Sequence, residues 1–288
     1  MFKKAERKQA RLRLALAGPS GSGKTYSALQ MAKGLGGRIA VIDTEHGSAS
    51  LYADIADFDV TELHAPYSPE RYIEAIKAAE RAGYDVLIID SYSHEWTGPG
   101  GCLEINDQIA KAKYKGNTWS AWNETTPRHR SLTDKILTSP LHIICTMRSK
   151  TETVQGEGKK ILKLGMKSEQ REGCEYEMTV VLDLVHDGNM AVASKDRTKL
   201  FKQPELITPE TGQRLLAWLN DGRSQATQAD DAVADALDKM PLAETMQELH
   251  GLYSAAYRQA QGYPDALAKL TEAKDKRKTE LAQLEGVA

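Results

Sequence analysis

The sequence contains only three cysteines among its 288 residues. Cys102, Cys145 and Cys174 form no Cys-x-x-Cys pair and have no pair of histidines beside them. Disulfide frameworks and zinc fingers need closely spaced or numerous ligands, so this pattern excludes both classes. Such sparse thiols are typical of a reducing compartment, and we expect a cytoplasmic protein.

Long apolar runs and an excess of charge of one sign are also missing. No stretch is long enough to span a bilayer, and residues 1–13 lack the apolar core of a signal peptide, so we expect no membrane association. The 38 basic and 40 acidic residues give a formal net charge of −2, so any contact with nucleic acid must come from local basic patches. The hydrophobic content of 41% is that of an ordinary globular protein, and the length allows one large or two modest domains.

The most informative stretch is a glycine-rich segment, Gly18-Pro19-Ser20-Gly21-Ser22-Gly23-Lys24-Thr25. It follows an apolar run that predicts a strand and precedes a helical pattern that opens with Tyr26, the context that a G-x-x-x-x-G-K-[ST] motif requires. Glycines let successive backbone N–H groups turn toward a phosphate, and the positive end of the helix dipole adds to the attraction. We therefore predict a nucleoside triphosphate site formed by residues 18–26, with Lys24 on the β- and γ-phosphates and Thr25 on Mg²⁺.

Two further apolar strands end in acidic residues. Residues 38–43 lead into Thr44-Glu45-His46-Gly47, and residues 84–90 end in Asp90. The strand–helix–strand spacing implies a parallel sheet, in which the carboxyl ends of the strands carry the chemistry. Glu45 would orient and deprotonate the attacking water, unless it is a surface carboxylate in a loop, and Asp90 would support the Mg²⁺ ion.

Other chemistry-bearing residues leave alternatives open. His94 and Glu95 follow the Asp90 strand closely and could sense a γ-phosphate or occupy an inert loop. Trp119 and Trp122 stand three residues apart in an expected helix, and this spacing favours core packing over a stacking platform for bases.

Residues 148–171 are strongly basic, with seven cations against three acids. Alternating stretches flank a Gly-x-Gly turn, which predicts a β-hairpin or a mobile loop. A solvated hairpin and a DNA-binding loop are both compatible with this pattern, and the basic groups at its start, which follow a strand, are also candidates for phosphate sensing. The candidate DNA-binding residues are Arg148, Lys150, Lys159, Lys160, Lys163 and Lys167.

We expect four parts along the chain: a basic arm (1–11), an ATPase core (12–222), a linker (223–232) and a helical C-terminal region (233–288). The arm is either a solvated helix or a contact with a neighbouring subunit or a phosphate backbone. The fold class is therefore α/β, a P-loop NTPase core whose mostly parallel central sheet is flanked by helices, with a small helical C-terminal appendage.

Residues 18–25, 41–47 and 86–91 together resemble the core of the RecA recombinase, in which a strand likewise ends in Asp-x-Glu-His. The resemblance implies a RecA-like ATPase core with ATP and Mg²⁺ as ligands and with the motif residues in the roles given above. It also implies that Tyr52 stacks on the adenine. Thr146-Met147-Arg148 departs from the family, whose strand-end glutamine has no counterpart here.

Lys195-Asp196-Arg197 resembles the Lys-x-Arg element of the RadA-type and DnaB-type ATPases. This resemblance implies that Lys195 and Arg197 reach the γ-phosphate of an adjacent subunit. Hydrolysis would then depend on assembly into a homo-oligomeric ring or filament.

The size and the helical tail are similar to those of the small RecA-like ATPases of bacteriophages, which are grouped with Sak-type annealing proteins and phage AAA-like nucleotide-binding proteins. The resemblance implies DNA-stimulated ATP hydrolysis on single-stranded DNA in recombination or annealing, in the host cytoplasm. A single-strand-binding or other recombination protein would contact the C-terminal helices. The alternatives are an ATP-switch scaffold without DNA-coupled activity and a motor subunit of the hexameric helicase or packaging type.

Overall fold

The computed structural model describes residues 4, 7–155, 161–222 and 225–285. The chain forms two compact units, Arg11–Trp218 and a second that joins Met1–Ala10 to Leu219–Ala288. The strands are β1 Arg13–Gly18, β2 Ile39–Asp43, β3 Asp59–Glu62, β4 Val86–Asp90, β5 His142–Gln155, β6 Ile161–Ser168, β7 Val180–Leu184 and β8 Ala191–Asp196. The helices that accompany them are α1 Lys24–Leu35, α2 Pro69–Arg81, α3 Ser93–Thr97, α4 Cys102–Lys113, α5 Thr118–Thr138 and α6 Pro209–Asn220, with short 3₁₀ turns η1 Ser48–Tyr52 and η3 Cys174–Glu177.

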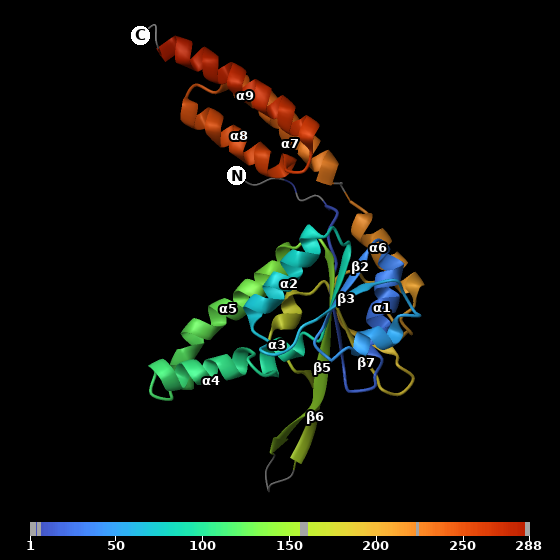
Figure 1. Ribbon diagram of the computed structural model, residues 1–288. Coiled ribbons are helices and arrows are strands. Elements are labelled where there is room, and N and C mark those ends of the chain that lie inside the picture. Colours follow the sequence, from blue (N-terminus) through green and yellow to red (C-terminus); the bar gives the residue numbers. More distant parts are fainter. Residues whose placement is uncertain (1–3, 5–6, 156–160, 223–224, 286–288) are drawn as a thin grey trace. The chain divides into compact units, whose positions relative to one another are not determined.

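An eight-stranded sheet organises the first unit (Figure 1). Its strand order is β3-β2-β4-β5-β1-β7-β8, with β6 paired to β5. All neighbours from β3 to β7 are parallel, whereas β8 is antiparallel to β7 and β6 is antiparallel to β5. The predicted α/β class with a mostly parallel sheet is confirmed.

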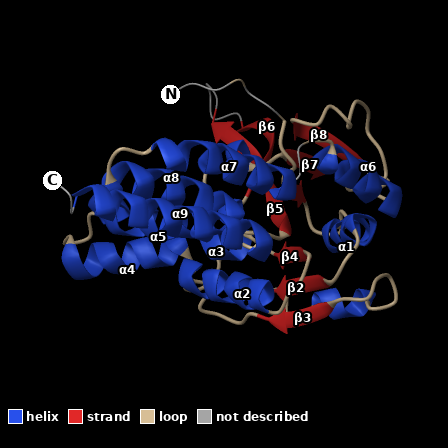
Figure 2. Ribbon diagram, turned by 90° about the horizontal axis from the view of Figure 1, so that it is seen from above, coloured by secondary structure: helices blue, strands red, loops and turns tan. Residues whose placement is uncertain are grey.

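Helices cover both faces of this sheet (Figure 2). α1 and α6 lie on one face, and α2, α4 and α5 lie on the other. Tyr72 of α2 and Ile136 of α5 share one buried cluster with Leu87 of β4 and Ile143 of β5. Because the sheet is buried on both faces, β1, β2 and β4 are apolar along nearly their whole length rather than alternating.

The position of β5 between β1 and β4 prepares the functional site. The register pairs Arg148 with Gly18 at the end of β1 and Cys145 with Ile89 near the end of β4. Residues 146–148 therefore lie between the glycine-rich segment and Asp90, at the edge where the parallel strands end.

β5 continues beyond the sheet and forms an antiparallel hairpin with β6. These paired strands confirm the predicted β-hairpin and not the mobile loop, whereas DNA binding by this segment stays a prediction. The turn over residues 156–160, which contains Lys159 and Lys160, lies outside the described residues, as does the side chain of Lys163.

The second unit is built from α7 Gln225–Lys239, the 3₁₀ turn η4 Met240–Leu242, α8 Met246–Ala260 and α9 Pro264–Glu285. These helices enclose a core of their own, which includes Val233, Leu249 and Leu270. The predicted linker over 223–232 is corrected, because its described part, from Gln225 onward, is helical. That segment has no glycine or proline after Gly222 and contains three alanines, a composition that favours a helix.

Trp119 corrects a second expectation, since its side chain is 86% exposed. It lies in the first turn of α5, beyond the end of α4, where no facing helix covers it in the described part of the chain. Trp122, one turn further, stacks on Trp96 with the ring centroids 5.4 Å apart. Across the described ranges, none of the helices has both the length and the apolar character needed to cross a membrane.

Two helical glycines set the approach of α1 to α6. A Cβ on Gly34 would lie 1.9 Å from the carbonyl oxygen of Pro209, and a Cβ on Gly212 would lie 2.3 Å from that of Met31. We expect Gly34→Ala to lower the free energy of unfolding by about 1–3 kcal/mol, because overpacking outweighs the helix preference of alanine, which is about 1 kcal/mol. Chemical denaturation measures this change.

The matched control is Gly251→Ala in α8, where nothing lies within 4 Å of the added Cβ. There only the helix preference acts, and we expect the second unit to gain about 1 kcal/mol. A gain from Gly34→Ala as well would contradict the close packing of α1 on α6.

Candidate nucleotide-binding site

A cavity of about 610 Å³ opens where β1, β2, β4 and β5 end. The predicted site residues that line it are Ser20, Gly21, Gly23, Lys24, Thr25, Glu45, Tyr52, Asp90 and Arg148. They come from segments far apart in the sequence, and the parallel sheet brings them to one edge. The cavity is therefore the natural place for a nucleotide with its metal ion.

The glycine-rich segment forms the loop between β1 and α1. Gly21 and Gly23 have φ angles of 77° and 80°, a conformation that side chains other than glycine rarely adopt. α1 begins at Lys24, so its N-terminal N–H groups and the positive end of its dipole lie beside the cavity. The Lys24 ammonium donates to the carbonyl oxygens of Gly18 at 3.1 Å and Pro19 at 2.8 Å, and burial lowers its pKa. A partly buried cation held over such a loop fits a phosphate group.

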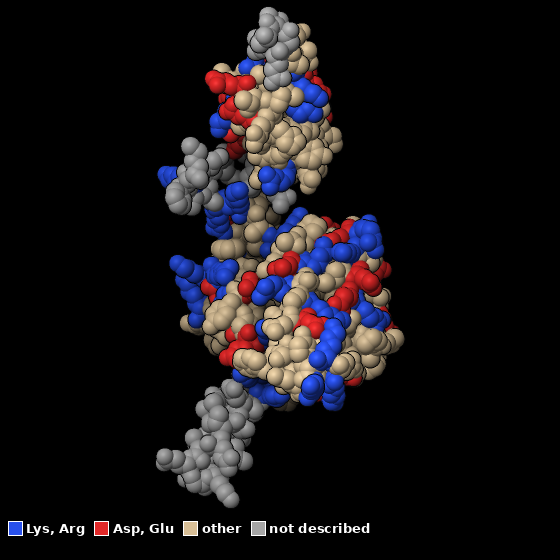
Figure 3. Space-filling view, turned by 90° about the vertical axis from the view of Figure 1, so that its left-hand side faces the viewer, with Lys and Arg blue, Asp and Glu red and all other residues tan. Residues whose placement is uncertain are grey.

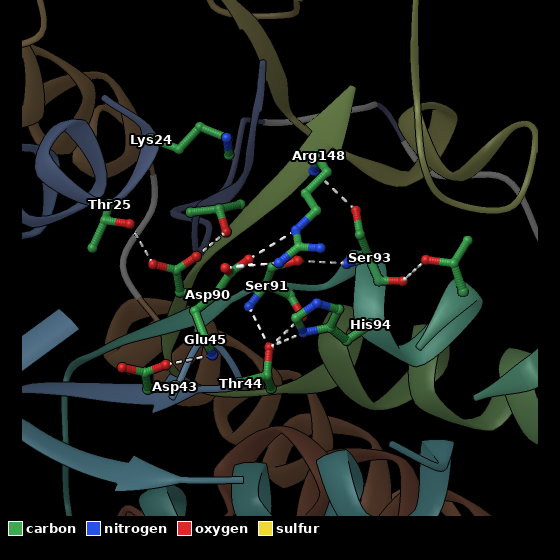
Figure 4. A network of polar contacts seen from close by, with 12 residues as sticks. Lys24, Thr25, Asp43, Thr44, Glu45, Asp90, Ser91, Ser93, His94 and Arg148 are labelled. Atoms are coloured by element: carbon green, nitrogen blue, oxygen red, sulfur yellow. Dashed lines mark hydrogen bonds and ion pairs between the residues drawn. The ribbon is translucent and has the colours of Figure 1, made fainter. Parts of the chain in front are cut away.

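Asp90 lies at the floor of the cavity between two hydroxyl groups (Figure 4). Thr25 Oγ1 donates to Oδ2 at 2.6 Å, and Thr146 Oγ1 donates to Oδ1 at 2.5 Å. The side chain is buried, and burial raises its pKa even though both hydrogen bonds act in the opposite direction. A cation would relieve this desolvated charge, and Mg²⁺ prefers such oxygen donors, so Thr25 and Asp90 fit a Mg²⁺ site.

Glu45 forms a two-pronged ion pair with Arg148 (Figure 4). Nε of Arg148 donates to Oε1 at 2.9 Å and Nη2 donates to Oε2 at 2.8 Å. Burial opposes the charge on Glu45, but the hydrogen bonds and the charge of Arg148 outweigh it and hold the pKa below its ordinary value. The backbone N–H of Glu45 also donates to Oδ1 of Asp43 at 2.6 Å. Glu45 is thus an ionised carboxylate fixed beside the cavity.

A polar network behind this pair joins the ends of β2, β4 and β5. Thr44 Oγ1 lies 2.7 Å from Nδ1 of His94 and accepts from the N–H of Ser91 at 2.8 Å. The N–H of Arg148 donates to Oγ of Ser93 at 2.9 Å. Burial and, next, the charge of Arg148 lower the pKa of His94. His94, which the sequence left open, therefore serves to hold these strand ends together.

Thr44, Ser93 and Thr146 are site residues that sequence reasoning did not assign. Thr146 could have been found as the polar residue that ends the apolar run of residues 140–146. Thr44 carries the same signal, since it directly follows the strand that ends at Asp43, whereas Ser93 lies in α3 and its contact with Arg148 follows only from the fold.

Two tyrosines stand at the rim. Tyr52 ends the 3₁₀ turn η1 and lines the cavity, and the ring of Tyr26 meets it edge-on with the centroids 6.4 Å apart. Tyr26 is 43% exposed. Flat apolar surfaces here suit a nucleotide base, but the adenine contact of Tyr52 stays a prediction.

Lys195 and Arg197 lie elsewhere and do not line this cavity. The Lys195 ammonium donates to the carbonyl oxygens of Glu175 at 2.8 Å and Tyr176 at 2.6 Å, and Nη2 of Arg197 donates to that of Tyr176 at 3.1 Å. Their contact with a γ-phosphate would need a second subunit, so this role stays a prediction.

Among the described candidate DNA-binding cations, Arg148 stands apart, because it is paired with Glu45 in the cavity. Lys150 and Lys167 are opposite each other in the β5–β6 ladder, and Nζ of Lys150 lies 3.4 Å from Glu169. On the face drawn in Figure 3, basic and acidic side chains lie among one another, in keeping with the near-zero net charge.

A family model described as an AAA domain matches residues 10–226. The match spans the sheet and every residue that lines the cavity. The chain belongs to this AAA domain family, AAA_24. No curated protein matches the chain significantly. The AAA domain is thus a nucleotide-binding P-loop ATPase domain.

In this AAA domain, we expect Asp90→Asn to stabilise the nucleotide-free protein while it abolishes Mg²⁺-dependent nucleotide binding. Burial raises the pKa of Asp90 above its ordinary value of 3.8. The free energy of unfolding therefore falls as the pH rises from that ordinary value through the raised pKa of the folded protein. The amide of asparagine carries no charge, so the variant avoids this loss of stability at neutral pH. A gain of about 1 kcal/mol corresponds to about 2–4 °C in Tm for a domain of this size. Calorimetry without nucleotide and binding of a fluorescent ATP analogue with Mg²⁺ measure the two effects.

The matched control is Asp183→Asn on β7, whose carboxyl pKa is also raised by burial but which does not line the cavity. This change should leave nucleotide binding intact. Full Mg²⁺-dependent binding by Asp90→Asn would remove Asp90 from the metal site.

Proposed function

We propose that the protein is a Mg²⁺-dependent ATPase that acts on single-stranded DNA in homologous recombination or strand annealing, in the cytoplasm. The observation that carries the ATPase part is the convergence of Lys24, Thr25, Glu45 and Asp90 on one cavity. The DNA part rests on the resemblance of the sequence to small RecA-like phage proteins of the Sak type.

In this proposal, the chain's own residues divide the chemistry among them. Lys24 and the N-terminus of α1 bind the β- and γ-phosphates, and Thr25 and Asp90 hold Mg²⁺, which neutralises charge on the phosphate oxygens. Tyr52 contacts the base. Glu45 orients the attacking water and takes its proton, a role that its ionised state supports.

In the nucleotide-free protein Arg148 has a positioning role, because it acts there through Glu45. Its side chain is 44% exposed while it holds the carboxylate with two of the five guanidinium donors. A γ-phosphate would compete with Glu45 for this fork, since both present pairs of anionic oxygens that a guanidinium binds through two N–H groups. Nucleotide binding would then free Glu45 to meet the water.

Coupling to DNA would run along β5. This one strand carries Thr146 and Arg148 at the cavity and continues into the basic hairpin, where Lys150 and Lys167 lie. Lys195 and Arg197 of a neighbouring subunit would supply cations to the transferring phosphoryl group, so that assembly into a ring or filament completes the site. The C-terminal helices would take a single-strand-binding or other recombination protein.

The Glu45–Arg148 pair also favours a second candidate, an ATP-switch scaffold. A base that is withdrawn in the resting protein is compatible with slow hydrolysis and a long-lived ATP-bound state. DNA-independent, very slow turnover would distinguish this candidate.

The test of the proposed function is steady-state ATP hydrolysis with and without single-stranded DNA, for wild type, Glu45→Gln and Arg197→Ala. We expect DNA to stimulate wild type. Glu45→Gln should lose about 10²–10⁴-fold in kcat while it still binds nucleotide, and Arg197→Ala should lose about 10³-fold. Turnover that ignores DNA, together with a silent Arg197→Ala, would overturn the recombinase proposal in favour of the switch.

Arg148→Ala tests the positioning role. The variant should lose about 10²-fold in kcat/KM, and the acid limb of its kcat/KM–pH profile, which reports the nucleotide-free protein in which the pair exists, should move to higher pH. Arg148 holds the pKa of Glu45 down, so its removal leaves burial to raise that pKa, and more alkaline conditions are then needed to ionise the base.

Arg128→Ala is the matched control, because Arg128 makes the same two-pronged pair with Glu70, at 2.6 and 2.8 Å, outside the cavity. Its pH profile should equal that of wild type. An unshifted profile for Arg148→Ala, or turnover faster than wild type, would contradict the positioning role.

A further inference from the structure

A second cluster of ligand-type side chains lies behind the nucleotide site. Glu95 of α3, Cys102 of α4 and His129 of α5 each offer one ligand atom, and these atoms lie within 4.8 Å of one another. Glu95 and Cys102 are completely buried, and His129 is 6% exposed. In the described part of the chain, no other group of three such side chains is this close. A buried carboxylate, thiol and imidazole at one point are a donor set that suits a transition metal.

The distances within the cluster are those of a nearly formed site. Cys102 Sγ lies 3.0 Å from Oε1 of Glu95, and Nδ1 of His129 lies 3.0 Å from the same oxygen and 3.3 Å from Oε2. Tetrahedral Zn²⁺ with bonds of about 2.0–2.3 Å to S, N and O ligands holds those ligands roughly 3.3–3.6 Å apart. An increase of about half an ångström in the Sγ–Oε1 and Nδ1–Oε1 distances would reach this spacing, and Sγ and Nδ1 already lie within 4.8 Å of each other.

Neighbouring groups fix the orientation of the ligands. Nε2 of Gln170 donates to Oε2 of Glu95 at 3.2 Å and to the carbonyl oxygen of Tyr92 at 3.0 Å, while its Oε1 accepts from the N–H of Arg171 at 2.7 Å. The ring of Trp96 packs edge-on against His129 with the centroids 5.4 Å apart. Outer contacts of this kind hold the ligands of a metal site in place.

A cavity of about 300 Å³ includes His129 in its wall, whereas Glu95 and Cys102 do not line it. The same wall carries Cys174, a half-buried cysteine that does not belong to the cluster.

We propose that Glu95, Cys102 and His129 bind a Zn²⁺ ion that fastens α3, α4 and α5 to one another. On binding, the Cys102 thiol releases its proton to solvent, and His129 coordinates through Nδ1 with its own proton on Nε2. The carboxylate and the thiolate then balance the charge of the divalent ion in the protein interior. The proposal does not depend on the ATPase or DNA activities.

The ion would act on the nucleotide site through α3. This helix follows β4 directly and carries Ser93, which accepts from the N–H of Arg148, and His94, which contacts Thr44. Because the Cys102 thiol loses its proton on binding, the affinity for Zn²⁺ should increase with pH.

The experiment uses the full chain, freed of metal by a chelator and kept without nucleotide or Mg²⁺. Titration with Co²⁺ should give one equivalent per chain, with tetrahedral absorption bands and a thiolate-to-cobalt charge-transfer band that Zn²⁺ removes. Cys102→Ser should lose the charge-transfer band, and Cys174→Ser should keep it. Gln170→Leu, which loosens Glu95, should weaken binding by about 10–100-fold.

Measurements on the wild-type protein alone also test whether the cluster binds Zn²⁺, even if the variants fail to fold. Its Tm should increase with Zn²⁺ concentration by mass action. Absence of stoichiometric Co²⁺ or Zn²⁺ binding by wild type would overturn the proposal, and would identify the cluster as a hydrogen-bonded anchor for Glu95. A charge-transfer band lost in Cys174→Ser but kept in Cys102→Ser would also overturn it.

Discussion

The parallel pairing of β5 with both β1 and β4 is the interaction on which the site depends. The register sets Gly18 beside Arg148 and Ile89 beside Cys145. From these positions Thr146 reaches Asp90 and Arg148 reaches Glu45. A slip of one residue would turn both side chains to the opposite face of the sheet, because strand side chains alternate. The backbone ladder therefore decides which acid meets which donor.

The charged side chains that this pairing brings together differ in whether they have a partner of opposite charge. Glu45 and Arg148 neutralise each other, so the pKa of Glu45 lies below its ordinary value. Lys24 and Asp90 are not paired with each other, and burial moves both toward their neutral forms, lowering the pKa of one and raising that of the other. A phosphate and a divalent cation bring the charges that these two lack. These two desolvated charges therefore support the proposed site for a nucleotide and a metal ion.

Local signals in the sequence predict most of the fold and the centre of the site. The glycine-rich segment, the strand-end acids and the basic hairpin are each encoded by contiguous residues. The order of the strands in the sheet is not encoded locally. The Glu45–Arg148 pair and the contact of Thr146 with Asp90 both follow from that order. The cluster of Glu95, Cys102 and His129 depends on the packing of three helices, so cysteine spacing could not reveal it. The predicted linker was wrong because the residues after Gly222 have a composition that favours a helix. A glycine ahead of them does not prevent α7 from beginning at Gln225.

β5 extends seven residues beyond Arg148, to Gln155, which at about 3.3 Å per residue makes an arm of about 23 Å. Its partner β6 stiffens it through a continuous antiparallel ladder with one irregularity at Glu152 and Thr153. Such an arm magnifies small rotations at its base. A tilt of about 5° at Arg148 displaces the far end by about 2 Å, on the basis of that rise per residue. A small rotation of the strand at Arg148 would therefore move Gln155 far enough to make or break contacts there.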